Sequence, residues 1–237
     1  MSNNPGIRHV GPPVERAGLV QPISPAVVVD ERLVFVAGQV PMRNGQPAGE
    51  DIASQTHYTL DLIEAILQRA GCTLADLSAI AFARGPGSFT GLRTACAVAQ
   101  GLAYGTRSSA HPDGLPVLAI DTLLALAETA TPTNHHGPVA TLLDARMDEL
   151  YVAPYAHTAQ GLSPLAPPRL CAPQDLGAYL AQCLPADAGL AEGRCLLAGN
   201  VFAAYTERLA HVPGQRLLAL PSASALLRLA PGLLAAG

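Results

Sequence analysis

The chain has 237 residues, of which 49% are hydrophobic and 14% are charged, so it can bury one sizeable core or two small ones. This composition excludes a disordered chain. The net charge is −4, and the 14 Lys and Arg residues form no basic stripe of the kind with which a protein binds nucleic acid by itself.

Neither the cysteines nor the apolar runs point to export or to a membrane. The five cysteines include no CxxC pair, which fits neither a disulfide framework nor a zinc site, so we expect reduced thiols. No apolar run approaches the roughly 18 to 20 residues that span a bilayer. The chain also begins without the apolar core of a signal peptide, and we therefore expect a cytoplasmic protein.

The first third of the chain predicts an arm, a hairpin and a helix. Residues 1–25 are rich in Pro and Gly and lack periodicity, which predicts a weakly ordered arm. Residues 26–29 and 33–37 are β-rich runs that predict a hairpin. Apolar residues at helical spacing then predict a helix over 51–70, with Asp51 as its N-cap.

Two strand–helix units follow. A short apolar strand over 79–82 meets a glycine-rich turn at 84–88, and an Ala-rich helix over 91–104 comes next. Residues 116–120 predict another strand, and a helix follows over 121–131.

The second half repeats the order of the first. The predicted elements are a hairpin of 139–143 and 150–154 around the turn 144–148, a helix over 173–184, a strand over 194–198, a turn at 199–200, a helix over 201–209, a strand over 216–220 and a helix over 222–236. Such duplication is typical of the actin-like, sugar-kinase-like (ASKHA) fold, in which two α/β lobes each carry a mixed sheet. We expect lobes over 26–131 and 138–237, divided near 131–137.

The loop before the Ala-rich helix is the segment most open to chemistry. Gly85, Gly87 and Gly91 permit positive φ and close approach, and with Ser88 they precede a helix N-terminus, where an anion binds well. The spacing is neither GxGxxG nor GxxxxGK[ST], and no lysine follows. Both an anion site and a purely structural turn remain open.

No other residues form a convincing catalytic or metal site. The seven histidines have no pair at metal-ligand spacing, so we expect no metal. Asp144, Asp148 and Glu149 resemble an acid/base cluster, but they fall in a predicted turn, where Asp serves local hydrogen bonding. Ser88 is not in a GxSxG elbow. We expect no catalytic residue and no cofactor.

Several stretches over residues 79–236 resemble the TsaB family. They are Gly85-Pro86-Gly87-Ser88-Phe89-Thr90-Gly91-Leu92-Arg93, Ala99-Gln100-Gly101-Leu102-Ala103, Leu118-Ala119-Ile120-Asp121-Thr122-Leu123, Asp144-Ala145-Arg146-Met147-Asp148-Glu149-Leu150-Tyr151 and Gly199-Asn200-Val201-Phe202. The resemblance implies the duplicated actin-like fold. It also implies a non-catalytic dimerisation subunit of the complex that forms threonylcarbamoyladenosine in tRNA.

The resemblance implies partners as well. The chain would form a heterodimer with the catalytic paralogue TsaD and activate it, with TsaE as a further partner, a homodimer when alone, and tRNA contact only through the complex. In the family the helices that match 51–70 and 91–104 dock against the matching pair of TsaD. The partner-binding residues expected on the second helix are Thr94, Ala97, Val98, Gly101 and Leu102. The alternative is that this apolar helix is buried inside its own lobe.

The N-terminal part departs from the family pattern. The first phosphate loop expected of a TsaB chain, an Ala-Ile-Asp-Thr-Ser strand end, has no match in residues 1–30. Residues 20–77 instead resemble the first half of a RidA-type enamine/imine deaminase, without the later strand that carries the arginine of that family. A RidA-like deaminase and a nucleotide-binding hydrolase acting through 85–91 are therefore the rival functions.

Overall fold

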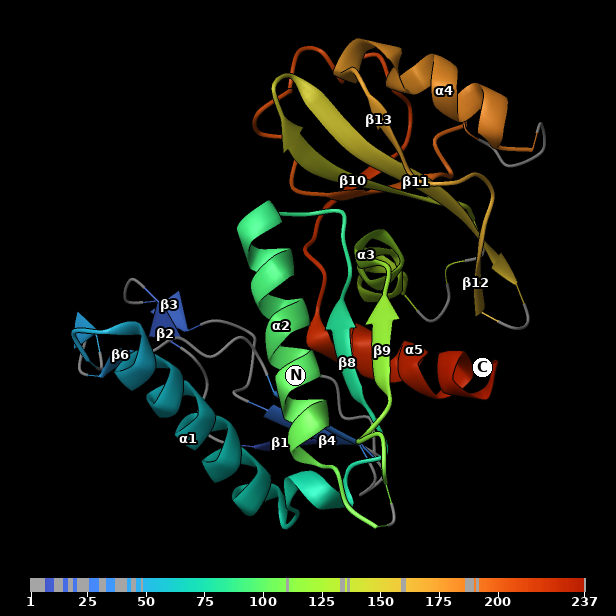
Figure 1. Ribbon diagram of the computed structural model, residues 1–237. Coiled ribbons are helices and arrows are strands. Elements are labelled where there is room, and N and C mark those ends of the chain that lie inside the picture. Colours follow the sequence, from blue (N-terminus) through green and yellow to red (C-terminus); the bar gives the residue numbers. More distant parts are fainter. Residues whose placement is uncertain are drawn as a thin grey trace. The chain divides into compact units, whose positions relative to one another are not determined.

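The computed structural model divides the chain into two compact units, Met1–Ile80 with Ala99–Val117 and Ala81–Val98 with Leu118–Gly237 (Figure 1). The structure describes the short strands between residues 7 and 47, and residues 49–236 except 110, 133–134, 136, 159–160, 186–189 and 191. No helix in this described part is long and apolar enough to span a bilayer.

The first unit contains a three-stranded antiparallel sheet in the order β1-β4-β5. The strands are β1 (Ile7–Val10), β4 (Ala26–Val29) and β5 (Leu33–Val36), with two short ladders formed by β2 (Glu15–Arg16) with β3 (Leu19–Val20) and by β6 (Met42–Arg43) with β7 (Gln46–Pro47). Pairing of β4 with β5 confirms the predicted hairpin.

The N-terminal arm and the RidA likeness are only partly open to inspection. Strands β1, β2 and β3 lie within residues 1–25, so this segment contains more regular pairing than its composition predicts. The other residues of the arm lie outside the described residues, as do the side chains of β4 and β5. The likeness of this region to the RidA family therefore stays a prediction.

Helix α1 (Ile52–Ala70) begins and ends as its sequence predicts. The Asp51 carboxylate accepts hydrogen bonds from the Ser54 N–H and hydroxyl, which lower the pKa of Asp51. Gly71 ends the helix in the left-handed region, at φ 79°, where a glycine is least strained. The helix packs on β1 and β5 through one face, and the short helix η1 (Leu74–Asp76) follows it.

Two parallel strands carry the candidate site. They are β8 (Ile80–Ala83) and β9 (Val117–Ile120), followed by α2 (Phe89–Gly105) and α3 (Thr122–Ala130) respectively. The Ile80 N–H donates to Pro116 O and the Arg84 N–H donates to Ile120 O, which is the offset of a parallel pair. Both predicted strand–helix units are confirmed, with α2 starting two residues before Gly91.

The second unit is built on a six-stranded mixed sheet. Its path runs β12 (Gly161–Pro164), β11 (Glu149–Thr158), β10 (Val139–Arg146), β14 (Leu196–Gly199) and β15 (Gln215–Leu218), with β13 (Arg169–Cys171) also paired to β11. Strands β10, β14 and β15 are parallel, whereas β10, β11 and β12 are antiparallel. The chain thus has the mixed α/β class predicted, and β12 and β13 are additions to the predicted set.

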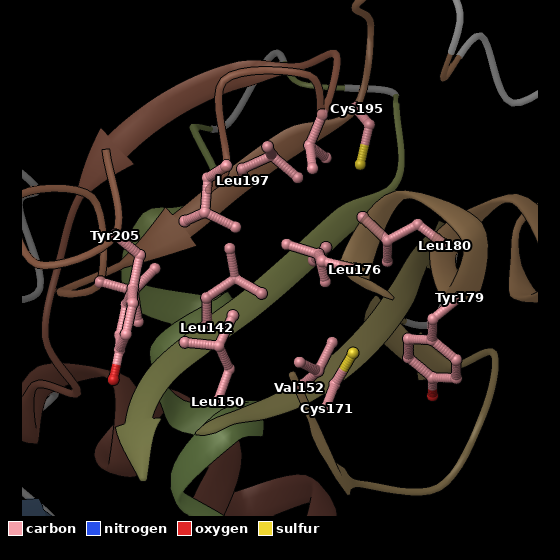
Figure 2. Close-up of a cluster of buried hydrophobic side chains, with 14 of the residues drawn as sticks. Leu142, Leu150, Val152, Cys171, Leu176, Tyr179, Leu180, Cys195, Leu197 and Tyr205 are labelled. Carbon is pink, nitrogen blue, oxygen red and sulfur yellow. The ribbon is translucent and has the colours of Figure 1, made fainter. Parts of the chain in front are cut away.

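Successive side chains along each strand point to opposite faces of the sheet. Buried apolar residues lie on both faces, so both faces are covered by other elements. On one face, as Figure 2 shows, Leu142, Val152 and Leu197 pack with Leu176 and Leu180 of α4 (Leu176–Cys183), which follows the short helix η2 (Pro173–Asp175). The other face packs against α3, which in turn contacts α5 (Ala223–Ala235). Helices α3 and α4 therefore lie on opposite sides of the sheet (Figure 1).

One element differs from the predictions. The predicted helix over 201–209 is a series of turns, although Val201, Tyr205 and Leu209 keep helical spacing and enter the core. Aromatic and β-branched residues in this stretch lower its helix propensity. The division into two lobes near 131–137 stays a prediction.

Candidate functional site

The loop between β8 and α2 is held against the start of α3. The carboxyl ends of parallel strands lie at the same edge of a sheet, so the segments that follow β8 and β9 are neighbours. The Gly85 N–H donates to Thr122 Oγ1 over 3.1 Å, and the Thr122 N–H donates to Gly85 O over 2.8 Å. This reciprocal pair fixes the glycine loop.

At only one of the three loop glycines does the backbone conformation favour glycine over other residues. Gly85 is buried with φ 112°, and a Cβ placed on it would lie 3.0 Å from Leu92 Cδ1. For Gly87 and Gly91 the nearest atoms to such a Cβ are at 3.8 and 3.7 Å, which is ordinary contact. The positive φ expected of all three glycines is found at Gly85 alone.

The N–H groups at the start of α3 are occupied by the chain itself. The Thr122 N–H donates to Gly85 O, and the next two N–H groups, of Leu123 and Leu124, donate to Asp121 Oδ1. The Ala125 N–H donates to Asp121 O. A helix start binds an anion through such donors, so α3 has none left for that purpose.

The predicted anion site at Gly85, Gly87, Ser88 and Gly91 stays a prediction. Its Gly85 N–H is already used by Thr122, which removes one donor that points from the loop. Ser88 and Gly91 are exposed, and Ser88 O accepts the Leu92 N–H within the first turn of α2. The described contacts therefore give the loop a structural role in positioning α2.

One long side of α2 is exposed. Ala99 and Ala103 are buried on the opposite side of the helix. Residues of the exposed side recur at intervals of three and four, which places them on one face. They are Thr90, Arg93, Thr94, Ala97, Val98, Gly101 and Tyr104, here called the α2 face.

The α2 face includes four of the five predicted partner-binding residues. Thr94, Ala97, Val98 and Gly101 are exposed, whereas Leu102 is half-buried. The Thr94 hydroxyl donates to Thr90 O, so its polar hydrogen is satisfied within the helix. The centre of the face is therefore small and largely apolar.

Larger side chains mark both ends of the α2 face. Phe89 and Tyr104 are each 68% exposed. The Arg93 guanidinium lies 3.9 Å from the Phe89 ring centroid, and that of Arg107 lies 4.9 Å from the Tyr104 ring centroid. Exposed aromatic and arginine side chains of this kind are the residues that most often anchor protein interfaces.

Of the three acidic residues predicted to lie in the hairpin turn, only Asp148 does, because the turn is confined to residues 147–148, whereas Asp144 lies in β10 and Glu149 begins β11. Asp144 Oδ1 accepts a hydrogen bond from the Tyr205 hydroxyl, and Asn200 Oδ1 accepts the Asp144 N–H. Asp148 pairs with Arg208 over 3.1 Å. Burial, the hydrogen bond to Asp144 and its charge raise the pKa of Tyr205. These carboxylates stabilise the hairpin and the turns that follow β14.

Within the residues the structure describes, no three His, Cys, Asp or Glu side chains gather as a metal site. All five cysteines are free thiols. Burial raises the pKa of Cys195, at the start of β14, to about 11, so that thiol is neutral and unreactive at ordinary pH. Cys195 is thus a packing residue of the core on one face of the sheet.

Thr122 lies in the stretch 118–123 that resembles the TsaB family, but the sequence analysis assigns it no role in the site. It is one of two buried polar residues among those described, the other being Thr141. A signal was available in the sequence, because Thr122 opens a predicted helix next to the predicted glycine loop. That signal places Thr122 in the sequence next to the loop, but it does not predict the hydrogen bond between Thr122 and Gly85.

The fold and the site together define a mixed α/β protein with an exposed helix of small residues and a glycine loop fixed to its neighbouring strand–helix unit. Its hairpin carboxylates Asp144 and Asp148 are bound to Tyr205 and Arg208. The chain belongs to the family whose model is described as "TsaD: tRNA N6-adenosine threonylcarbamoyltransferase", which matches residues 51–211, more than half of its length. Within that family it is TsaB/YeaZ-like, in agreement with the predicted resemblance.

The relatives that support this placement are of two kinds. The Escherichia coli protein named "tRNA threonylcarbamoyladenosine biosynthesis protein TsaB" is 38% identical to this chain over 107 residues. The match covers 45% of this chain and 43% of the relative. The Haemophilus influenzae protein of that name is 41% identical over 103 residues, covering 43% and 41%. The chain thus spans less than half the length of these curated relatives.

A solved structure matches more of the chain. The structure titled "YeaZ from Pseudomonas aeruginosa" superposes with a TM-score of 0.65 at 30% identity, and it covers 90% of this chain and 86% of that one. This match is consistent with an actin-like fold and extends across both units.

Proposed function

We propose that the chain is a non-catalytic subunit of the complex that forms threonylcarbamoyladenosine in tRNA, where it binds and activates TsaD. The observation that carries the proposal is the exposed α2 face. The relatives named TsaB support the biosynthetic process. The dimeric arrangement, the identity of the partner and the non-catalytic role are what we propose beyond that process.

The surface of α2 suits a close contact between helices. Its central residues, Ala97 and Gly101, have small or no side chains, and Thr94 binds its hydroxyl to the helix backbone. Two helices with such surfaces approach to about 8–10 Å between axes, which buries apolar area efficiently. Phe89 and Tyr104 at the two ends then provide the large apolar contacts that such an interface needs.

A non-catalytic role agrees with the chemistry of the described residues. The Gly85 N–H is bound to Thr122, Asp144 accepts a hydrogen bond from Tyr205, and Asp148 pairs with Arg208. We propose the actin-like arrangement with lobes over 26–131 and 138–237, a cytoplasmic location, TsaE as a further partner and a homodimer when TsaD is absent. With a net charge of −4, the chain would contact tRNA only through the complex.

The test places a charge on the α2 face. Ala97→Glu should abolish binding to TsaD, because an unpaired carboxylate buried in an apolar contact costs several kcal/mol, on the order of 2–7. Ala97 is exposed in the free chain, so the fold should persist. The measurement is co-purification of tagged TsaD with each variant, with circular dichroism to verify folding.

Ala178→Glu is the matched control, since Ala178 is an exposed alanine of α4 on the other side of the six-stranded sheet from α3. It should bind TsaD as the wild type does. A folded Ala97→Glu variant that still co-purifies with TsaD would show that α2 is not the binding helix.

A further inference from the structure

We propose that Thr122 is the positioning residue of the α2 face, because its hydroxyl fixes the glycine loop and the loop sets where α2 begins. The inference rests on the proposed function, in which that face binds TsaD. Thr122 itself does not belong to the face.

The contact between Thr122 and the loop is buried and reciprocal. Thr122 is 8% exposed, and Gly85 is buried as well. Each residue donates its N–H to the other, at 3.1 Å to Thr122 Oγ1 and at 2.8 Å to Gly85 O. If the Thr122 hydroxyl is removed, the buried Gly85 N–H loses its acceptor and can reach water only if the loop moves. The free-energy cost of this removal is therefore larger than the net value of one hydrogen bond.

Thr122 stands on a rigid element. Leu123 and Leu126 of α3 are fully buried against the six-stranded sheet, and Asp121 caps the helix through the Leu123 and Leu124 N–H groups. The position of the Thr122 hydroxyl is therefore set by the core of the second unit and not by the loop it holds.

The loop in turn contacts the first turn of α2 and so positions the N-terminal end of this helix. The position of a Cβ on Gly85 would lie 3.0 Å from Leu92 Cδ1, so Leu92, in the first turn of α2, packs directly on the held glycine. Leu92 also donates its N–H to Ser88 O. A binding face needs its supporting contacts to hold it within about 0.5 Å of the productive geometry, and Thr122 supplies such a contact at the N-terminal end of α2.

Three variants separate positioning from general stability. Thr122→Val removes the hydroxyl and keeps the branched shape, whereas Thr122→Ser keeps the hydroxyl. Thr141→Val is the matched control, because Thr141 is 0% exposed and its hydroxyl donates to Ala153 O over 3.0 Å in the six-stranded sheet. The readouts are amide hydrogen exchange of residues 85–92 and the calorimetric Kd for TsaD.

For Thr122→Val we expect exchange of residues 85–92 to become about tenfold faster and the Kd for TsaD to rise about tenfold, as the loss of one buried hydrogen bond predicts. Thr122→Ser should match the wild type in both readouts. Thr141→Val should lower the urea midpoint as Thr122→Val does, yet leave both readouts unchanged.

Unchanged exchange in Thr122→Val would overturn the inference, as would equal weakening of TsaD binding by Thr141→Val. Ala97→Glu, measured alongside, keeps the two proposals apart. If Ala97→Glu binds TsaD normally, the α2 face is not the binding surface, and hydrogen exchange alone still decides whether Thr122 positions the loop.

Discussion

At the scale of single residues, the glycines show where sequence reasoning stops. The motif around Gly85, Gly87 and Gly91 predicts three special backbone positions, yet only Gly85 has a positive φ. Gly199, predicted as part of a tight turn, ends β14 beside Leu142 of β10. A Cβ on Gly199 would overlap with Leu142 O, and this close approach depends on strand pairing that the local sequence does not reveal.

Gly199→Ala should therefore destabilise the protein by about 2–3 kcal/mol, because the parallel pair of β10 and β14 has to separate to admit the methyl group. Urea unfolding monitored by circular dichroism measures this change. Gly232→Ala in α5 is the control, since no atom lies within 4 Å of its Cβ position. It should be neutral or stabilising by up to about 1 kcal/mol, and an equal loss in both variants would contradict the packing explanation.

At the scale of elements, strand and helix order was predictable where periodicity and caps agree. Helices α1 and α3 begin after Asp51 and Asp121, and Asp51 is the residue predicted to cap α1. The segment 201–209 has apolar residues at helical spacing but low helix propensity. Its apolar residues pack into the core, while its backbone forms a series of turns. Exposure of the α2 face could not be predicted, because an Ala-rich helix suits both a buried and an exposed position.

The cap of α3 provides the prediction at this scale. Asp121→Ala leaves the Leu123 and Leu124 N–H groups without their acceptor and should lower the free energy of unfolding by about 1–2 kcal/mol. Asp121→Asn keeps a capping oxygen and should recover most of that loss. Chemical denaturation of the three proteins measures it, and an alanine variant as stable as the wild type would mean that the cap contributes nothing.

At the scale of the whole molecule, the family placement was predictable from the loop and its neighbouring motifs. The division into lobes near 131–137 stays a prediction, whereas the second unit shows a core that the sequence did not predict, in which Leu123 of α3 packs with Val139 and Ala198 of the six-stranded sheet. Such a core joins residues far apart in the chain, which no local pattern specifies. The α2 helix contributes residues to both compact units.

The central claim is that this chain enables TsaD to modify tRNA by binding through the α2 face. The most direct measurement is TsaD-dependent formation of threonylcarbamoyladenosine in tRNA, with the chain absent, with the wild-type chain and with Ala97→Glu. We predict that the wild-type chain strongly increases the rate and that Ala97→Glu, although folded, leaves it at the level without the chain. No increase with the wild-type chain, or an equal increase with Ala97→Glu, would contradict the account.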